Sequence, residues 1–122
     1  MAKRIDTGEG REALAAVHAA RDAGAKPARA HLATAVRYLL QLLMEKAPGG
    51  SVEVRVPPFG AAQVIQGPRH TRGTPPNVVE MDAATWIDLA TGDTPWEAAL
   101  ADGRISASGV RADIAALLPL RP

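Results

Sequence analysis

The spacing of apolar residues predicts helices in the first part of the chain. Residues 7–24 form an Ala-rich segment with a thin apolar stripe, which indicates a helix that packs along a narrow face. Over residues 28–47 the large apolar residues fall at i, i+4, i+7, i+8 and i+11, a period typical of an amphipathic helix with one broad buried face. These residues are Leu32, Val36, Leu39, Leu40 and Leu43.

After Pro48 the apolar period shortens from 3.6 to two, which predicts strands. Residues 51–56 alternate valine with charged residues, as a half-buried strand does. A Pro-Pro-Phe-Gly turn then leads into a second strand at 61–66, so the pair is expected to form an antiparallel hairpin. The elements predicted beyond the Pro- and Gly-rich stretch at 67–77 are a strand at 78–81, helices at 82–90 and 94–103, a strand at 104–108 and a helix at 110–118.

This order of elements predicts an α+β fold in which helices cover a mainly antiparallel sheet. At 122 residues, with 47% hydrophobic and 22% charged residues, the chain is expected to form a single domain, 1–122. Its 14 basic and 13 acidic residues give a net charge of +1, which argues against a nucleic-acid partner. No apolar run reaches the ~20 residues of a membrane span, and no signal peptide is evident, so we expect a cytoplasmic protein without stable membrane insertion.

The residues that carry common catalytic chemistry form no recognisable constellation. The absence of cysteine excludes disulfides, thiolate metal sites and a cysteine nucleophile. His18, His31 and His70 lie far apart in the sequence and match no zinc-binding spacing, and no serine occurs in a GxSxG motif. We therefore expect a protein that is not an enzyme and that has no catalytic residues, no metal site and no cofactor.

The second half of the chain carries a recognisable series of elements. A short apolar strand leads into the aromatic-bearing helix at 82–92, and a second short helix follows directly. The sequence at 103–109 then reads Gly, basic, apolar, x, small, x, Gly, and an amphipathic segment closes the chain. In this series the chain resembles the sterol carrier protein-2 family, particularly its small bacterial members. The resemblance implies a five-stranded sheet covered by helices around an apolar tunnel that holds sterols, fatty acids, acyl-CoA or other lipids.

Apolar residues on the predicted sheet and helices are the candidate wall of such a cavity. The alternative is that they form an ordinary packed core. Phe59, at the hairpin turn, has three possible roles: contact with a membrane, guarding the mouth of a pocket, or capping the core. The candidate ligand-binding residues are Leu39, Leu43, Val54, Val56, Phe59, Trp86, Ile105 and Leu117.

A cationic segment between the second and third strands is the candidate polar rim. Arg69, His70 and Arg72 lie among small and polar residues that let backbone amides approach an anion. Two interpretations are open for these residues. They bind a carboxylate or phosphate head group, or they form part of a solvent-exposed connector. The leading hypothesis is a carrier of a small hydrophobic ligand, such as a fatty acid, acyl-CoA or another lipid. The alternatives are an accessory domain that acts beside a thiol-dependent isomerase or transferase, and a ligand-free interaction module.

Overall fold

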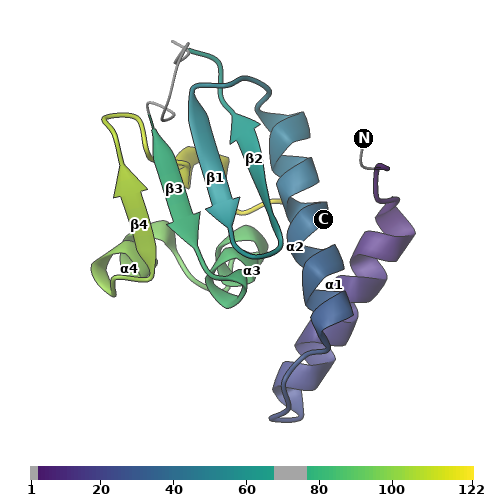
Figure 1. Ribbon diagram of the computed structural model, residues 1–122. Helices are drawn as coiled ribbons and strands as arrows, with labels where there is room; N and C mark the ends of the chain where they lie inside the picture. Colours follow the sequence, from purple (N-terminus) through teal and green to yellow (C-terminus); the bar gives the residue numbers. More distant parts are fainter. Residues whose placement is uncertain (1–2, 68–76) are drawn as a thin grey trace.

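The computed structural model describes residues 3–67 and 77–122, and it contains helices on one side of a mixed sheet (Figure 1). The predicted helices and strands up to residue 108 are confirmed, with ends that shift by a few residues. The elements in chain order are α1 (Thr7–Asp22), α2 (Arg29–Lys46), β1 (Val52–Val56), β2 (Gly60–Val64), β3 (Val78–Met81), α3 (Ala83–Thr91), α4 (Trp96–Ala101), β4 (Ile105–Ser108) and the 3-10 turn η1 (Ala115–Leu117).

The described sheet has four strands in the order β2-β1-β3-β4, so the expectation of five mainly antiparallel strands is wrong. β1 pairs with β2 and β3 with β4 in antiparallel fashion, but β1 and β3 run parallel, with Val54 opposite Val79. The hairpin signal in the sequence specifies only the local β1–β2 pair. The pairing of β1 with β3 joins strands that are distant in sequence, and no local pattern specifies its direction.

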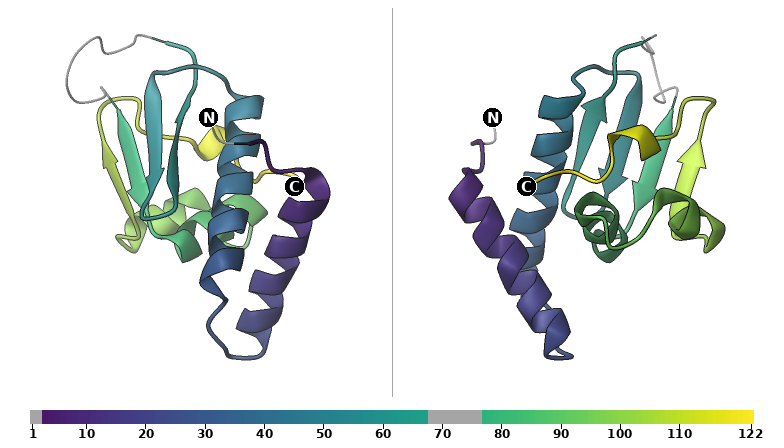
Figure 2. Two further views of the ribbon diagram at one scale, coloured as in Figure 1. Left: turned by 45° about the vertical axis from the view of Figure 1, so that its right-hand side comes forward. Right: turned by 180° about the vertical axis from the view of Figure 1, so that it is seen from behind.

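The predicted helix at 110–118 is also corrected, because only Ala115–Leu117 form a helical turn. The Asp113 side chain accepts a hydrogen bond from the Ala115 amide at 2.8 Å, so the turn begins there, and Pro119 soon ends any helix. Val110, expected on the buried stripe, is 99% exposed. Ile114, which was expected on the same stripe, is buried, and so is Leu120, where this segment crosses the helix-bearing side of the sheet (Figure 2).

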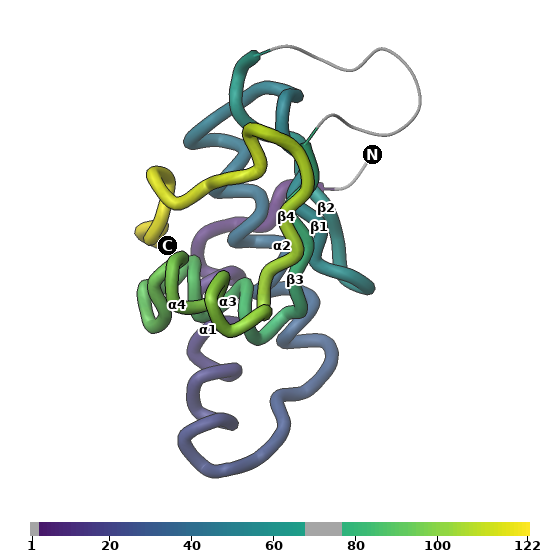
Figure 3. Tube along the Cα trace, turned by 90° about the vertical axis from the view of Figure 1, so that its left-hand side faces the viewer, coloured from purple at the N-terminus to yellow at the C-terminus, as the bar shows by residue number. Residues whose placement is uncertain are grey.

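The two faces of the sheet differ in cover and in chemistry. Seen from the side, α3, α4 and the C-terminal segment lie on one side of the strands (Figure 3). In β1, the three valines that face this side are buried, whereas Glu53 and Arg55 point to the other face and pair with each other. α1 packs against α2 on the side away from the sheet (Figure 1).

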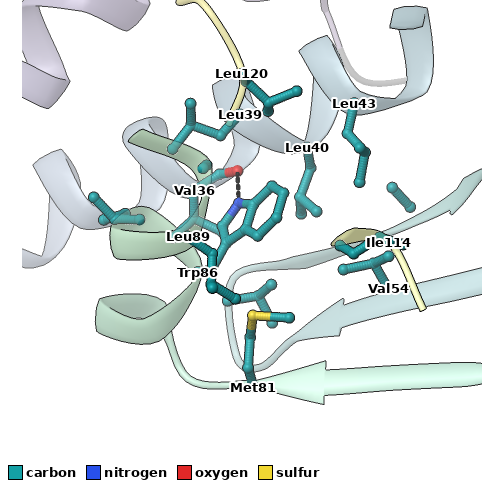
Figure 4. Packing of buried hydrophobic residues seen from close by; sticks show 14 of the residues in the cluster. Val36, Leu39, Leu40, Leu43, Val54, Met81, Trp86, Leu89, Ile114 and Leu120 are labelled. Atoms are coloured by element: carbon teal, nitrogen blue, oxygen red, sulfur yellow. Dashed lines mark hydrogen bonds between the residues drawn. The ribbon is translucent and has the colours of Figure 1, made fainter. Parts of the chain in front are cut away.

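The core forms where α2, α3 and the sheet meet, and Trp86 lies at its centre (Figure 4). Its side chain is fully buried, and the indole N–H donates to the carbonyl oxygen of Val36 at 3.2 Å. Leu39 and Leu40 of α2 and Met81 of β3 surround the ring (Figure 4). Trp86 therefore joins α3 to α2 by both apolar packing and a hydrogen bond.

Besides the apolar side chains that α1 buries in the core, a close packing contact and an ion pair attach it to the rest of the molecule. Gly10 lies so close to the ring of Tyr38 in α2 that a Cβ atom added there would be 2.3 Å from ring carbon Cγ. At the other end of α1, Arg21 pairs with Asp88 of α3 at 2.7 Å. Asp88 also pairs with Arg104, just before β4, at 2.9 Å. One carboxylate thus joins three parts of the chain that are far apart in sequence.

Replacing Asp82 by alanine is expected to lower the free energy of unfolding by about 1 kcal/mol at neutral pH, because Asp82 caps α3. Its carboxylate accepts a hydrogen bond from the Thr85 amide at 2.8 Å, and this bond lowers the pKa of Asp82. A lowered pKa stabilises the folded state at pH values above the ordinary pKa of 3.8. This stabilisation is lost as the pH falls through the lower pKa of the folded state. The difference in the free energy of unfolding between wild type and Asp82→Ala should therefore decrease at acidic pH. Urea unfolding at a series of pH values measures this difference.

Asp93→Ala is the matched control for this prediction. Asp93 is an exposed carboxylate just after α3 that accepts no hydrogen bond from another described residue. Its replacement should change stability by no more than about 0.5 kcal/mol. An equal loss in both variants, or a loss in Asp82→Ala that does not depend on pH, would contradict the assignment of Asp82 as the cap.

Candidate functional site

The largest of the described pockets is a groove of about 460 Å³ on the surface of α2. Its volume lies within the range of small-molecule sites. The N-terminal segment forms one wall, α2 forms the floor and the β1–β2 hairpin forms the other wall. The lining residues are Lys3, Arg4, Ile5, Arg37, Leu40, Gln41, Met44, Glu45, Phe59, Gly60 and Ala61.

The N-terminal wall is held to α2 by side-chain contacts. The Gln41 amide accepts from the Ile5 N–H at 2.9 Å and donates to the Ile5 carbonyl at 2.8 Å, as a neighbouring β-strand would. Arg4 contacts both carboxylate oxygens of Glu45, at 2.8 and 3.0 Å. The hydrogen bond with Arg4 lowers the pKa of Glu45, and the same bond raises the pKa of Arg4. Ile5 is thereby fixed beside the floor of the groove.

The surface of the groove is mostly apolar, although Arg37, Gln41 and Glu45 of α2 also line it. Leu40 is buried beneath it, and Ile5 is half-buried at its side. Met44 is 42% exposed, a large fraction for a long apolar side chain in a helix. Methionine is flexible and polarisable, so it adapts to apolar partners of different shapes. The groove therefore offers a surface on which an apolar ligand can bury area without disturbing the core.

Phe59 forms the hairpin end of the groove and is surrounded by arginines. Its amide donates to the carbonyl of Val56 at 2.9 Å, which closes the turn, and its own carbonyl accepts from Arg37 Nε at 2.8 Å. The guanidinium carbon of Arg29 lies 5.2 Å from the ring centroid, in a cation–π contact. The ring also packs against the core cluster. Of its three possible roles, Phe59 therefore combines two, because it caps the core and borders a pocket at the same time.

Phe59 lines the groove, whereas the other predicted ligand-binding residues do not. Leu39, Leu43, Val54, Val56 and Trp86 have an exposed fraction of 0%, and Ile105 is 6% exposed. A side chain that lined a void wide enough for water would have accessible surface, so the five fully buried residues pack as core. Leu117 is partly buried at the edge of this core. Ligand binding by these residues would require the sheet and helices to separate, and it stays a prediction. The predicted rim of Arg69, His70 and Arg72 lies outside the described residues.

Sequence reasoning missed most of the groove because it treated one face of α2 as solvated. Arg37, Leu40, Gln41 and Met44 are spaced i, i+3, i+4 and i+7, so they share a helix face. Arg37 and Gln41 lie outside the apolar stripe from which the buried face was predicted. Met44, an apolar residue one turn after Leu40, was the signal that this side is not uniformly polar. No pattern indicated that Ile5 would pair with Gln41, which lies 36 residues away.

Neither a metal site nor a membrane-spanning helix is found in the described part of the chain. Residues 3–67 and 77–122 contain no group of three histidine or acidic side chains arranged to hold a metal ion. Within the same residues, no helix has both the length and the apolar character needed to cross a membrane.

Comparison with known proteins identifies the family. The search of curated proteins found no match. Residues 28–120, most of the chain, match a protein family described as "Bacterial SCP ortholog", where SCP stands for sterol carrier protein. The match runs from the start of α2 to Leu120, beyond η1, and so includes every described strand and helix except α1. The chain therefore belongs to this bacterial family of sterol carrier protein orthologues, as its sequence resemblance suggested.

Proposed function

We propose that the protein binds a small hydrophobic ligand, such as a fatty acid, acyl-CoA or another lipid, in the groove on α2. The observation that carries this proposal is an apolar floor within a groove of about 460 Å³ that opens to solvent between cationic side chains. Membership of the sterol carrier protein family supports a lipid-binding role. The ligand would enter by partition into an existing surface depression, which requires no opening of the core.

The groove suits a ligand with an apolar chain and an anionic end. Each methylene group removed from water contributes about 0.8 kcal/mol, so about six of them would contribute on the order of 5 kcal/mol before the costs of association. Arg37 and Lys3 line the groove and form no ion pair within the described residues. An arginine can bind a carboxylate or phosphate with two parallel hydrogen bonds. Arg37 is already oriented by its hydrogen bond to the Phe59 carbonyl.

Met44→Asp is expected to weaken the binding of a fluorescent fatty acid, 11-(dansylamino)undecanoic acid, by about 10-fold or more. The substitution places a carboxylate on the apolar floor, where the ligand chain would remove its hydration. It also repels an acidic head group. Because Met44 is 42% exposed, the change should leave the fold intact. Titration of the probe, followed by its fluorescence, measures the effect.

Leu100→Asp is the matched control for Met44→Asp. Leu100 is an apolar residue of α4 with 44% exposure, it lies outside the groove, and its replacement makes a similar change of charge. This variant should bind the probe as the wild type does. If both variants bind with unchanged affinity, the groove is not the site, and binding would then have to involve the interior residues. If the wild type binds no fatty acid, the proposed function fails.

A further inference from the structure

We propose that the surface around the β1–β2 hairpin turn docks on anionic membranes. This surface, called here the hairpin face, consists of Pro57, Pro58 and Phe59 together with Lys3, Arg29 and Arg37. Three of its residues, Lys3, Arg37 and Phe59, line the groove, so docking would bring one border of the groove to the lipid surface. The inference concerns where the protein acts, and it goes beyond the binding of a ligand within the groove.

The charge of the hairpin face is unbalanced, although the chain as a whole has a net charge of only +1. Two other cations that line pockets beside the hairpin are already paired, because Arg4 binds Glu45 and Arg55 binds Glu53. Glu80 is an exposed carboxylate beside Pro57 and Pro58, and it offsets one positive charge. Lys3, Arg29 and Arg37, in contrast, form no ion pair among residues 3–67 and 77–122. All three are exposed. An anionic surface would complement these three charges.

The position of Arg29 is unfavourable for the helix that contains it. Arg29 begins α2, where the helix dipole disfavours a positive charge. The first turn of α2 has no acidic residue, and Ala28 at the N-cap provides no side-chain hydrogen bond. The cation–π contact with Phe59 holds the guanidinium beside the hairpin turn despite this cost. A residue that breaks a local rule of helix design is expected where function requires it.

Apolar groups at the centre of the hairpin face favour a membrane over a nucleic acid. Pro57 and Pro58 are exposed at the turn, and Phe59 is half-buried between arginines. Exposed Met44 lies along the same groove. An aromatic residue with apolar neighbours, flanked by two arginines, suits the boundary between lipid head groups and acyl chains. Binding of nucleic acid would instead call for a basic stripe, which the near-neutral chain lacks.

Sedimentation with lipid vesicles tests the proposal on the full chain. We expect binding to vesicles of phosphatidylglycerol and phosphatidylcholine in about equal amounts, and little binding to phosphatidylcholine alone. The double variant Arg29→Gln with Arg37→Gln should bind the anionic vesicles about 10- to 30-fold more weakly, because each cation near such a surface contributes appreciably to affinity. Added salt should weaken wild-type binding in the same way.

Arg111→Gln with Arg121→Gln is the control for net charge. Both arginines are exposed, and Arg111 lies beside Gly67 and Ser51, at the other end of β1 and β2 from the hairpin turn. This variant has the same net charge as the test variant, so it should bind anionic vesicles as the wild type does. Equal weakening in the two variants would show a general charge effect and overturn the proposal. Absence of wild-type binding, or preferential binding of DNA over vesicles, would overturn it too. Titration with the fluorescent fatty acid tests the groove separately. It therefore distinguishes failure of membrane docking from failure of ligand binding in the groove.

Discussion

Trp86→Ala should lower the free energy of unfolding by about 3–5 kcal/mol, a large share of the stability of a small domain. The indole is fully buried between α2, α3 and the sheet, so its removal leaves a cavity that rigid neighbours cannot fill. Leu39 and Val54 are also fully buried, and both belong to elements fixed by many other contacts. Chemical unfolding followed by circular dichroism measures the loss.

Trp86→Phe separates packing from hydrogen bonding at this position. Phenylalanine keeps an aromatic ring in the core but has no N–H to donate to Val36. We expect a loss of about 1–2 kcal/mol, from the missing hydrogen bond and the smaller ring. Since the stability of a whole domain is about 5–15 kcal/mol, this variant remains measurable even if Trp86→Ala does not fold. A loss below about 1 kcal/mol in Trp86→Ala would show that Trp86 is not central to the core.

Gly10→Ala should destabilise the protein by about 1–3 kcal/mol, the cost typical of an overpacked contact. An added Cβ would lie 2.3 to 2.5 Å from three carbons of the Tyr38 ring, closer than any real contact. Tyr38 is buried, so the ring has little room to move away. The clash should push α1 away from α2, and hydrogen exchange should then increase in α1 more than in the sheet.

Gly8→Ala is the control in the same helix, and its expected effect is much smaller. A Cβ atom at Gly8 would meet only the Asp6 carboxylate oxygen, at 3.3 Å, and the site is exposed. Alanine favours a helix over glycine by up to about 1 kcal/mol, but the contacted oxygen also caps α1 by accepting from the Glu9 amide. The two effects oppose each other, so this variant should change stability by less than about 0.5 kcal/mol. Stabilisation by both substitutions would show that α1 and α2 are not in close contact at Gly10.

Periodicity predicted the elements of this fold better than their pairing. The stripe that contains Leu39 and Leu43 located α2 almost to its ends, and the alternation of valines located β1. The parallel pairing of β1 with β3 was missed, because strand direction is set by contacts between distant segments. The closing segment failed for a local reason, since its apolar residues are spaced for a helix but a helical turn forms only at Ala115–Leu117.

The candidate site was harder to predict than the fold. Sequence analysis selected large apolar residues on the predicted buried faces, and five of the eight are fully buried, as core residues are. The groove is lined instead by the boundary between the apolar and polar faces of α2, where Leu40 and Met44 lie beside Arg37 and Gln41. Its N-terminal wall depends on Ile5, whose backbone N–H and carbonyl both form hydrogen bonds with the Gln41 side chain. Phe59 was found because an aromatic residue in a Pro-rich turn is unusual.

The groove is formed partly by residues within the family match and partly by residues that precede it. Its α2 floor and hairpin wall lie within residues 28–120, the region that matches the family, whereas Lys3, Arg4 and Ile5 lie before it. A member of the family with a different N-terminal segment would keep the same framework and yet present a differently shaped opening. Under the proposed function, the choice of guest molecule would therefore depend partly on residues that lie outside the region defining the family.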